Sequence, residues 1–227
     1  MSAVATRIRV WDLPTRIFHW ALAALVIFSF TTGKMGGAWM AWHLKSGYAI
    51  LALLAFRIAW GFAGSRSARF AHFLRGPRAM LEYARATFSR RHPFTEGHNP
   101  IGGWMVILML AVLALQAATG LFADDEIATQ GPLAAKVSEA LVARMTTIHK
   151  YNEWVIVAAV VVHVAAVAAY QWGLKLDLLR PMIHGWKAVP VGMRHAESAR
   201  ASSLLALVLA GAAAAMVYWL VAVYPKG

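Results

Sequence analysis

The chain has 227 residues, of which 60% are hydrophobic and only 14% are charged, and its formal net charge is +12. A soluble domain carries about 25% charged residues, so this composition indicates an integral membrane protein. Cysteine is absent, which excludes thiolate-bound iron–sulfur clusters, disulfides and haem attached through a C-x-x-C-H motif. The basic residues lie in connecting segments, where topology accounts for them, so nucleic acid is not expected as a partner.

Five hydrophobic segments are long enough to cross a hydrocarbon core of about 30 Å at about 1.5 Å per residue. The first is too long for a cleaved signal peptide and is interpreted as a retained span. In chain order the segments cover residues 14–33, 38–62, 101–121, 147–170 and 202–224. The expected fold is an all-α integral membrane protein, with a four-helix transmembrane bundle and a fifth, C-terminal transmembrane helix.

The links between the spans define the expected domains. A basic link covers residues 65–97, and its part from 78 to 88 has the apolar pattern of a short helix lying at the membrane surface. Residues 1–190 are expected to form one membrane domain with four spans. Residues 191–227 add a second basic link and the fifth span.

Lys and Arg are unequally divided between the two sides of the membrane. The side of the N-terminus has Arg7, Arg9, Arg66, Arg69, Arg75, Arg78, Arg85, Arg90, Arg91, Lys175, Arg180, Lys187, Arg194 and Arg200. The opposite side has Lys34, Lys136, Arg144 and Lys226, together with Asp124, Asp125 and Glu126. By the positive-inside rule, the N-terminus is expected in the cytoplasm and the C-terminus in the periplasm of a bacterial inner membrane.

The nine histidines fall into two groups. Those in links are expected to be solvated or interfacial: His72, His92, His98, His184 and His195. Those within spans are His19, His43, His149 and His163. An ionisable side chain inside a span is costly and is usually functional, so this second group is the candidate site.

Depth sorts the four intramembrane histidines into two pairs. His19 and His163 are expected in the cytoplasmic third of the membrane, and His43 and His149 in the outer third. His149 and His163 are 14 residues apart, which places them about 21 Å apart along one helix and within about 40° of the same face. One helix would therefore supply one ligand to each of two stacked sites.

Two imidazoles at one depth, without cysteine, fit the axial ligation of a b-type haem that only transfers electrons. The prediction is two bis-His haems, one on His19 and His163 and one on His43 and His149. Two alternatives stay open. The histidines form hydrogen bonds between helices, or they bind a bare metal such as zinc, for which two ligands per site are too few.

Weaker sequence evidence indicates further residues that contact the cofactors. Gly47 is one turn from His43, and a small residue there admits a flat macrocycle or another helix; the same holds for Gly103 and Gly120 in the third span. Basic residues near the depths where haem propionates emerge are Arg16, Arg57, Lys45 and Lys150. Arg57 has the alternative of extending its side chain to the membrane interface.

Four stretches carry a resemblance to a known family. They read VWDLPTRIFHW at residues 10–20, HLKSGY at 43–48, RIAWGF at 57–62 and GHNPIGGW at 97–104. These resemble the prokaryotic cytochrome b561 family, which overlaps with the cytochrome b subunits of nickel–iron hydrogenases. The resemblance covers roughly residues 7–190. It implies a four-helix core with two b haems held at His19, His43, His149 and His163, and quinone-linked electron transfer.

The expected function is electron transfer between the quinone pool and a periplasmic redox protein, such as a c-type cytochrome or an oxidoreductase subunit. One alternative within the family is superoxide:quinone oxidoreduction, in which Lys34, Lys45, Arg144 and Lys150 would attract the anion. Another is the cytochrome b subunit of a hydrogenase-type complex. A transporter or haem-handling protein is a remote alternative, because the spans show no broken-helix signal in two matching halves.

Overall fold

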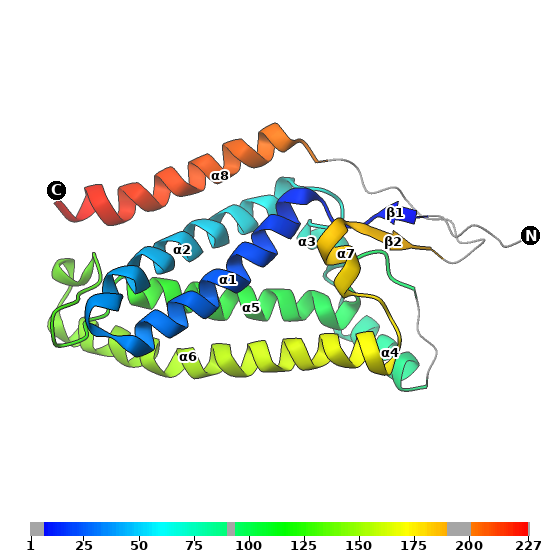
Figure 1. The fold of residues 1–227 in the computed structure, drawn as a ribbon, viewed down its shortest axis with the longest axis horizontal. Coiled ribbons are helices and arrows are strands. Elements are labelled where there is room, and N and C mark those ends of the chain that lie inside the picture. The colour runs from blue at the N-terminus through cyan, green and yellow to red at the C-terminus, as the bar shows by residue number, and fades with distance from the viewer. Residues whose placement is uncertain (1–6, 90–93, 190–200, 227) are drawn as a thin grey trace, which may run out of the picture. The chain divides into compact units, whose positions relative to one another are not determined.

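A computed structural model describes residues 7–89, 94–189 and 201–226 of the chain. Figure 1 shows the order of its helices and strands. Several residues used above to predict topology, or expected to be solvated, lie outside the described residues: Arg90, Arg91, His92, Arg194, His195 and Arg200. The predicted domain boundary at residue 190 also falls there, so that division stays a prediction.

Long helices dominate the described residues. They are α1 (Leu13–Met35), α2 (Met40–Ala63), α5 (Pro100–Gly120), α6 (Glu139–Ala168) and α8 (Ser203–Tyr218). A short 3-10 helix, Gly37–Trp39, precedes α2, and π-helical turns at Ala169–Gly173 and Trp219–Val223 continue α6 and α8. Within the described part of the chain, five such segments are long and apolar enough to cross a membrane. The predicted all-α membrane fold is thereby confirmed.

The fourth span is longer than its hydrophobic segment. Its helix, α6, begins at Glu139 rather than near residue 147. The first two turns contain polar residues, which hydropathy does not detect, and Ser138 Oγ accepts a weak hydrogen bond from the Leu141 amide at 3.4 Å. A serine before the first turn and an acid within it both favour a helix start, so the sequence contained a local signal for this boundary.

A two-stranded antiparallel sheet, which the sequence analysis did not predict, joins distant parts of the chain. Strand β1 (Arg7–Arg9) pairs with β2 (Trp186–Ala188). The pairing continues where the Val10 amide donates to the Gly185 carbonyl at 2.8 Å. Gly185 has a φ of 90° and ends the short helix α7 (Leu179–His184). Strands of three residues are too short for a period-two pattern to be recognised.

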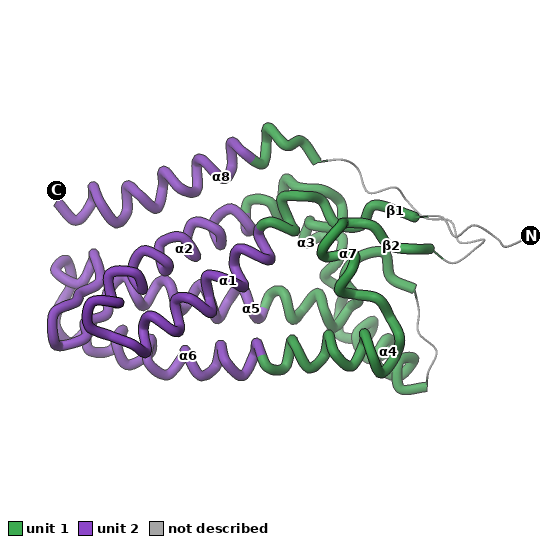
Figure 2. The backbone as a smooth tube through the Cα atoms, in the orientation of Figure 1, with its two compact units in different colours: residues 1–17, 59–107, 161–206 green, residues 18–58, 108–160, 207–227 purple. Residues whose placement is uncertain are grey.

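The described residues form two compact units, coloured in Figure 2. Of the described residues, unit 1 contains 7–17, 59–89, 94–107, 161–189 and 201–206, and unit 2 contains 18–58, 108–160 and 207–226. The core of unit 2 comes from four helices. Ile50 and Leu54 of α2 pack with Leu113 of α5 and Ile156 of α6, and Leu25 of α1 packs against this cluster. This packing is the expected four-helix arrangement.

Unit 1 is built around a polar junction at the start of α1. Asp12 Oδ1 accepts a hydrogen bond from the Thr15 amide at 2.6 Å, so Asp12 caps the helix. Asp12 Oδ2 accepts from Trp60 Nε1 at 3.2 Å and from the Ser65 hydroxyl. Trp60 is 0% exposed, so these bonds satisfy a buried indole at the end of α2. One carboxylate therefore fixes the start of one span to the end of the next.

The link after α2 also belongs to unit 1. It contains the short helix α3 (Phe70–Phe73) and α4 (Pro77–Phe88), which matches the short helix predicted over residues 78–88; its position at the membrane surface stays a prediction. Lys187 of β2 donates to the Thr95 carbonyl at 2.7 Å and lies over the Phe94 ring, 5.1 Å from its centre. Burial lowers the pKa of this ammonium. The contacts join the sheet to the segment before α5.

Candidate functional site

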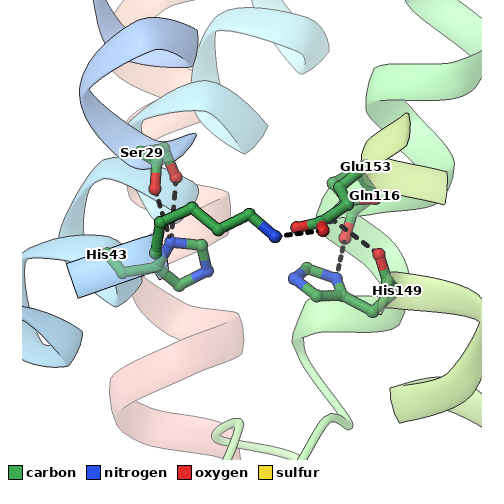
Figure 3. Close-up of polar contacts among 6 residues, drawn as sticks. Ser29, His43, Gln116, His149 and Glu153 are labelled. Atoms are coloured by element: carbon green, nitrogen blue, oxygen red, sulfur yellow. Dashed lines mark hydrogen bonds and ion pairs between the residues drawn. The ribbon is translucent and has the colours of Figure 1, made fainter. Parts of the chain in front are cut away.

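Two of the four candidate histidines face each other within unit 2. His43 is the fourth residue of α2 and His149 lies in α6. Their ring centres are 6.0 Å apart and their ring planes are at 90° (Figure 3). The predicted pairing of these residues therefore corresponds to an observed juxtaposition.

Each of the two rings is held through its Nδ1 atom by a main-chain carbonyl. His43 Nδ1 lies 2.8 Å from the Ser29 carbonyl of α1, and His149 Nδ1 lies 3.0 Å from the Gln116 carbonyl of α5. A carbonyl only accepts, so Nδ1 must carry the proton in both rings. In the neutral form of each ring, Nε2 then keeps its lone pair, which is the arrangement found in metal-ligating histidines.

A glycine lies next to each ring, four residues after the carbonyl that binds it. A Cβ atom at Gly33 would lie 2.8 Å from His43 Nδ1, and one at Gly120 would lie 2.9 Å from His149 Cε1. Both distances are shorter than real Cβ atoms accept. Helices α1 and α5 thus contact the rings of His43 and His149, respectively, in the same way, through a carbonyl and a glycine one turn apart.

Hydroxyl groups and an amide surround these two rings. The Ser29 and Thr119 hydroxyls each lie 3.3 Å from the nearer Nδ1. Gln116 Nε2 donates to the His149 carbonyl at 3.1 Å, and Asn152 Nδ2 donates to Gln116 Oε1 at 2.8 Å. Asn152 is buried, so α5 and α6 are joined by satisfied polar groups beside His149.

An ion pair that the sequence analysis did not predict lies in the same unit. The Lys34 ammonium at the end of α1 contacts the Glu153 carboxylate, one turn after His149 on α6. It also lies 5.0 Å from the centre of the Trp154 ring, as a cation–π contact. Only half of the signal was present in the sequence: an acid inside a span, Glu153, needs a cationic partner, but nothing in the sequence identifies Lys34 as that partner.

The distance between the rings fits one transition-metal ion between them. An imidazole nitrogen binds such ions at about 2.0–2.1 Å and lies about 1.1 Å from its ring centre, so opposed ligands have centres about 6.2–6.4 Å apart. The observed 6.0 Å is close to this range. The angle between the ring planes does not oppose a shared ion, which the two rings would hold through their Nε2 atoms, because each lone pair lies in the plane of its own ring. The donors therefore fit the iron of a b-type haem.

The other two candidate histidines belong to different units. His19 of α1 lies in unit 2, where its ring makes an edge contact with Trp20 at 5.0 Å between centres. His163 of α6 lies in unit 1 and is half-buried. The continuous helix α6 carries both His149 and His163, as expected. The pairing of His19 with His163 stays a prediction.

The basic candidates have distinct environments. Arg57 is 3% exposed and its guanidinium lies 6.0 Å from the centre of the Phe18 ring, which disfavours the alternative that it extends to the interface. Arg16 Nη1 donates to the Ile183 carbonyl at 2.5 Å in unit 1. Lys45 and Lys150 are exposed, and Lys45 lies 4.7 Å from the centre of the Trp42 ring. Their contact with haem propionates stays a prediction.

The three candidate glycines also have different environments. A Cβ atom at Gly47 would have no neighbour within 4 Å in the described structure, so packing against another helix does not account for this glycine. At Gly103 a Cβ atom would lie 2.9 Å from the Phe73 carbonyl, which makes that glycine a packing residue for α3. Gly120, by contrast, makes room for the ring of His149.

The histidines of the links also differ from one another. His72 and His184 are exposed, as expected. His98 instead packs between aromatic rings, with centres 4.7 Å from Trp11 and 4.9 Å from Phe73. His98 is therefore part of the packing of unit 1, which no spacing in the sequence indicated.

A protein-family model described as prokaryotic cytochrome b561 matches residues 10–185, well over half of the chain. The chain belongs to the prokaryotic cytochrome b561 family. Members are membrane-embedded b-type cytochromes that bind haem b and act in electron transfer. The cytochrome assignment agrees with the helices and with the facing imidazoles of unit 2. No curated protein and no solved structure matches the chain significantly.

Proposed function

We propose that this cytochrome holds two b haems and transfers electrons between the quinone pool and a redox partner of the respiratory chain in a bacterial inner membrane. The observation that carries the proposal is the facing pair His43 and His149, with both Nδ1 atoms bound to carbonyls. His19 and His163 are proposed to form the second site. The partner is proposed to be a periplasmic c-type cytochrome or an oxidoreductase subunit.

When bound, haem b supplies the one-electron chemistry, and the protein supplies position and local polarity. The Ser29 and Gln116 carbonyls orient the two imidazoles and increase the basicity of their Nε2 atoms. Gly33 and Gly120 allow the rings to lie against α1 and α5. No proton transfer by a side chain is needed, which agrees with rings whose Nδ1 protons are already engaged.

The charges near this site support a role in setting its potential. The Lys34–Glu153 pair is net neutral, and the exposed Lys45 and Lys150 follow His43 and His149 closely along their helices. A nearby cation favours the reduced state of a redox centre, since reduction adds negative charge. The Lys and Arg distribution supports a cytoplasmic N-terminus, which would place this site on the periplasmic side.

A pyridine haemochrome assay with a redox titration of the purified protein tests this proposal. We expect two b haems per chain with separate midpoint potentials. His43→Ala and His149→Ala should each reduce the ratio to about one haem per chain, because each removes one axial ligand. His72→Ala, which changes an exposed histidine of a link, is the matched control and should retain both haems. A colourless wild-type protein, or His43→Ala protein with full haem content, would contradict the proposal.

The quinone part of the proposal needs a separate measurement. Anaerobic addition of a quinol analogue to the oxidised protein should reduce at least one haem, as followed by the α band of its optical spectrum. Reduction should be lost when His19→Ala and His149→Ala are combined, because one ligand of each proposed site is then missing. Full haem content without any reduction by quinol would leave the haem assignment intact and reject the quinone assignment.

A second candidate, superoxide:quinone oxidoreduction, is favoured by the exposure of Lys45 and Lys150 close to His43 and His149. Exposed cations would attract the superoxide anion and raise its association rate at low salt. Stopped-flow reduction by superoxide should then slow in Lys45→Glu combined with Lys150→Glu, with unchanged haem content. Equal rates in the variant and the wild type would reject this activity.

A further inference from the structure

Unit 1 contains a cavity that the haem site does not use. Its volume is about 240 Å³. Its polar lining consists mainly of Arg9, Arg66, His72, Arg75, Glu96 and His98. All of these residues belong to unit 1, and they come from β1, the link after α2 and the segment before α5.

The lining of the cavity is strongly basic. Among the described residues that line it, three guanidinium groups and two imidazoles are opposed by one carboxylate, that of Glu96. Within the described residues, the Nε atom of Arg9 is shielded from solvent and has no hydrogen-bond partner. A buried donor without an acceptor is costly, so this atom indicates that an acceptor other than the described residues belongs nearby.

The cavity lies where spans of unit 1 begin and end. Arg9 is four residues before the start of α1 at Leu13, and Arg66 is three residues after the end of α2 at Ala63. His98 is two residues before the start of α5 at Pro100. The ends of apolar spans meet the lipid headgroups, so the lining side chains lie at headgroup depth.

We propose that this cavity binds a phosphate group. Guanidinium groups bind phosphate oxygens through two parallel hydrogen bonds, and a planar fork on each arginine makes this geometry specific. The volume is below the range of about 300–1,000 Å³ that holds drug-sized ligands, and it suits a compact headgroup. The phosphodiester of an anionic phospholipid and a free phosphate ion are the two sources of such a group, and basic pockets between spans recognise the former.

Calorimetric titration of the full chain, purified in detergent at 0.15 M salt, tests the proposal. The titrants are dihexanoyl phosphatidylglycerol, dihexanoylglycerol, which lacks the phosphate, and inorganic phosphate. We expect phosphatidylglycerol to bind and dihexanoylglycerol not to bind. Arg66→Gln combined with Arg75→Gln should weaken that binding about 30-fold, as expected for two basic residues at an anionic headgroup. Both arginines are exposed, so the variant should keep its helix content in circular dichroism.

The matched control removes the same charge outside the cavity. Arg78→Gln combined with Arg85→Gln changes exposed residues of α4 and should weaken binding less than about 3-fold, because salt screens distant charges. Glu96→Gln should tighten binding about 5-fold, since it removes the opposing carboxylate. Binding of inorganic phosphate with the same dependence on Arg66 and Arg75 would support the proposal with a free ion as the source. Equal effects of the two double variants, or equal binding of the lipid without phosphate, would overturn it.

Discussion

The two units use buried polar groups for different purposes. In unit 2, the carbonyls of Ser29 and Gln116 hold the side chains of His43 and His149. In unit 1, the carboxylate of Asp12 holds a helix start and the buried indole of Trp60. The first arrangement orients two imidazole rings that face each other, whereas the second fixes a helix start and an indole ring. A buried polar contact is therefore evidence for a cofactor site where it orients one ionisable side chain toward another ionisable side chain. Where it joins the ends of two helices, it is evidence for a structural role.

The largest expected effect is on haem content, and it comes from displacing the His149 ring without changing the stability of the fold. Gly120→Val places methyl groups where the ring of His149 lies, because even a Cβ atom would be 2.9 Å from Cε1. We expect the ratio of haem to protein to fall from about two to about one in the haemochrome assay. Gly211→Val in α8 is the control, since a Cβ atom there has no neighbour within 4 Å. A Gly120→Val protein with unchanged haem content and potentials would show that the glycine serves only helix packing.

Replacement of Asp12 in unit 1 should lower the stability of the protein and leave its haem content unchanged. Asp12→Ala removes the cap of α1 and the acceptor of Trp60 Nε1, and the loss should be about 2–4 kcal/mol in the free energy of unfolding. Denaturant titration of the detergent-purified protein measures it. Asp177→Ala, at an exposed acid that accepts from the Arg180 amide, should cost less than about 1 kcal/mol. The haem content of the folded fraction should stay at the wild-type value in both variants.

A smaller effect is expected where a polar group of unit 2 supports the site indirectly. Asn152→Ala removes the donor to Gln116 Oε1 and to the Val112 carbonyl, and it should lower the free energy of unfolding by about 0.5–2 kcal/mol. The midpoint potential of one haem should also shift, because the Gln116 side chain that Asn152 holds donates to the His149 carbonyl. Thr147→Ala, which loses a bond only to the Ala143 carbonyl of its own helix, is the control and should leave both potentials unchanged.

The smallest effect concerns the loop between α5 and α6. Asp125 Oδ1 accepts from the amides of Thr129, Ile127 and Ala128, and these bonds, the one from Thr129 above all, lower the pKa of Asp125 to about 2. The ordinary value is 3.8, so the stabilisation is complete above pH 3.8 and is lost as the pH falls through about 2. Hydrogen exchange at Ala128 and Thr129 should therefore be faster in Asp125→Asn than in the wild type at pH 5. The two should be equal below pH 2, and a difference that persists there would contradict the assignment.

The sequence predicted the fold and the key histidines well because both produce strong one-dimensional signals. Spans are long apolar runs, and a histidine inside such a run stands out. It did not predict the partners of those histidines, since the groups that bind Nδ1 are main-chain carbonyls that every residue has. The Lys34–Glu153 pair was missed because Lys34 reads as a turn residue and its partner is 119 positions away. His98 was missed as a packing residue because its aromatic neighbours come from separate segments.

The hydrogen bond between Val10 and Gly185 has a consequence for how the protein is made. These two residues are also the first and last that match the family model. During synthesis, β1 emerges before α1 but obtains its pairing strand only after α6 and α7 have followed. Pairing of β1 with β2 would therefore occur only after the four spans between them have been synthesised. A ribosome-stalled chain ending before residue 186 should consequently leave its N-terminal segment open to protease, while one ending after α8 should protect it.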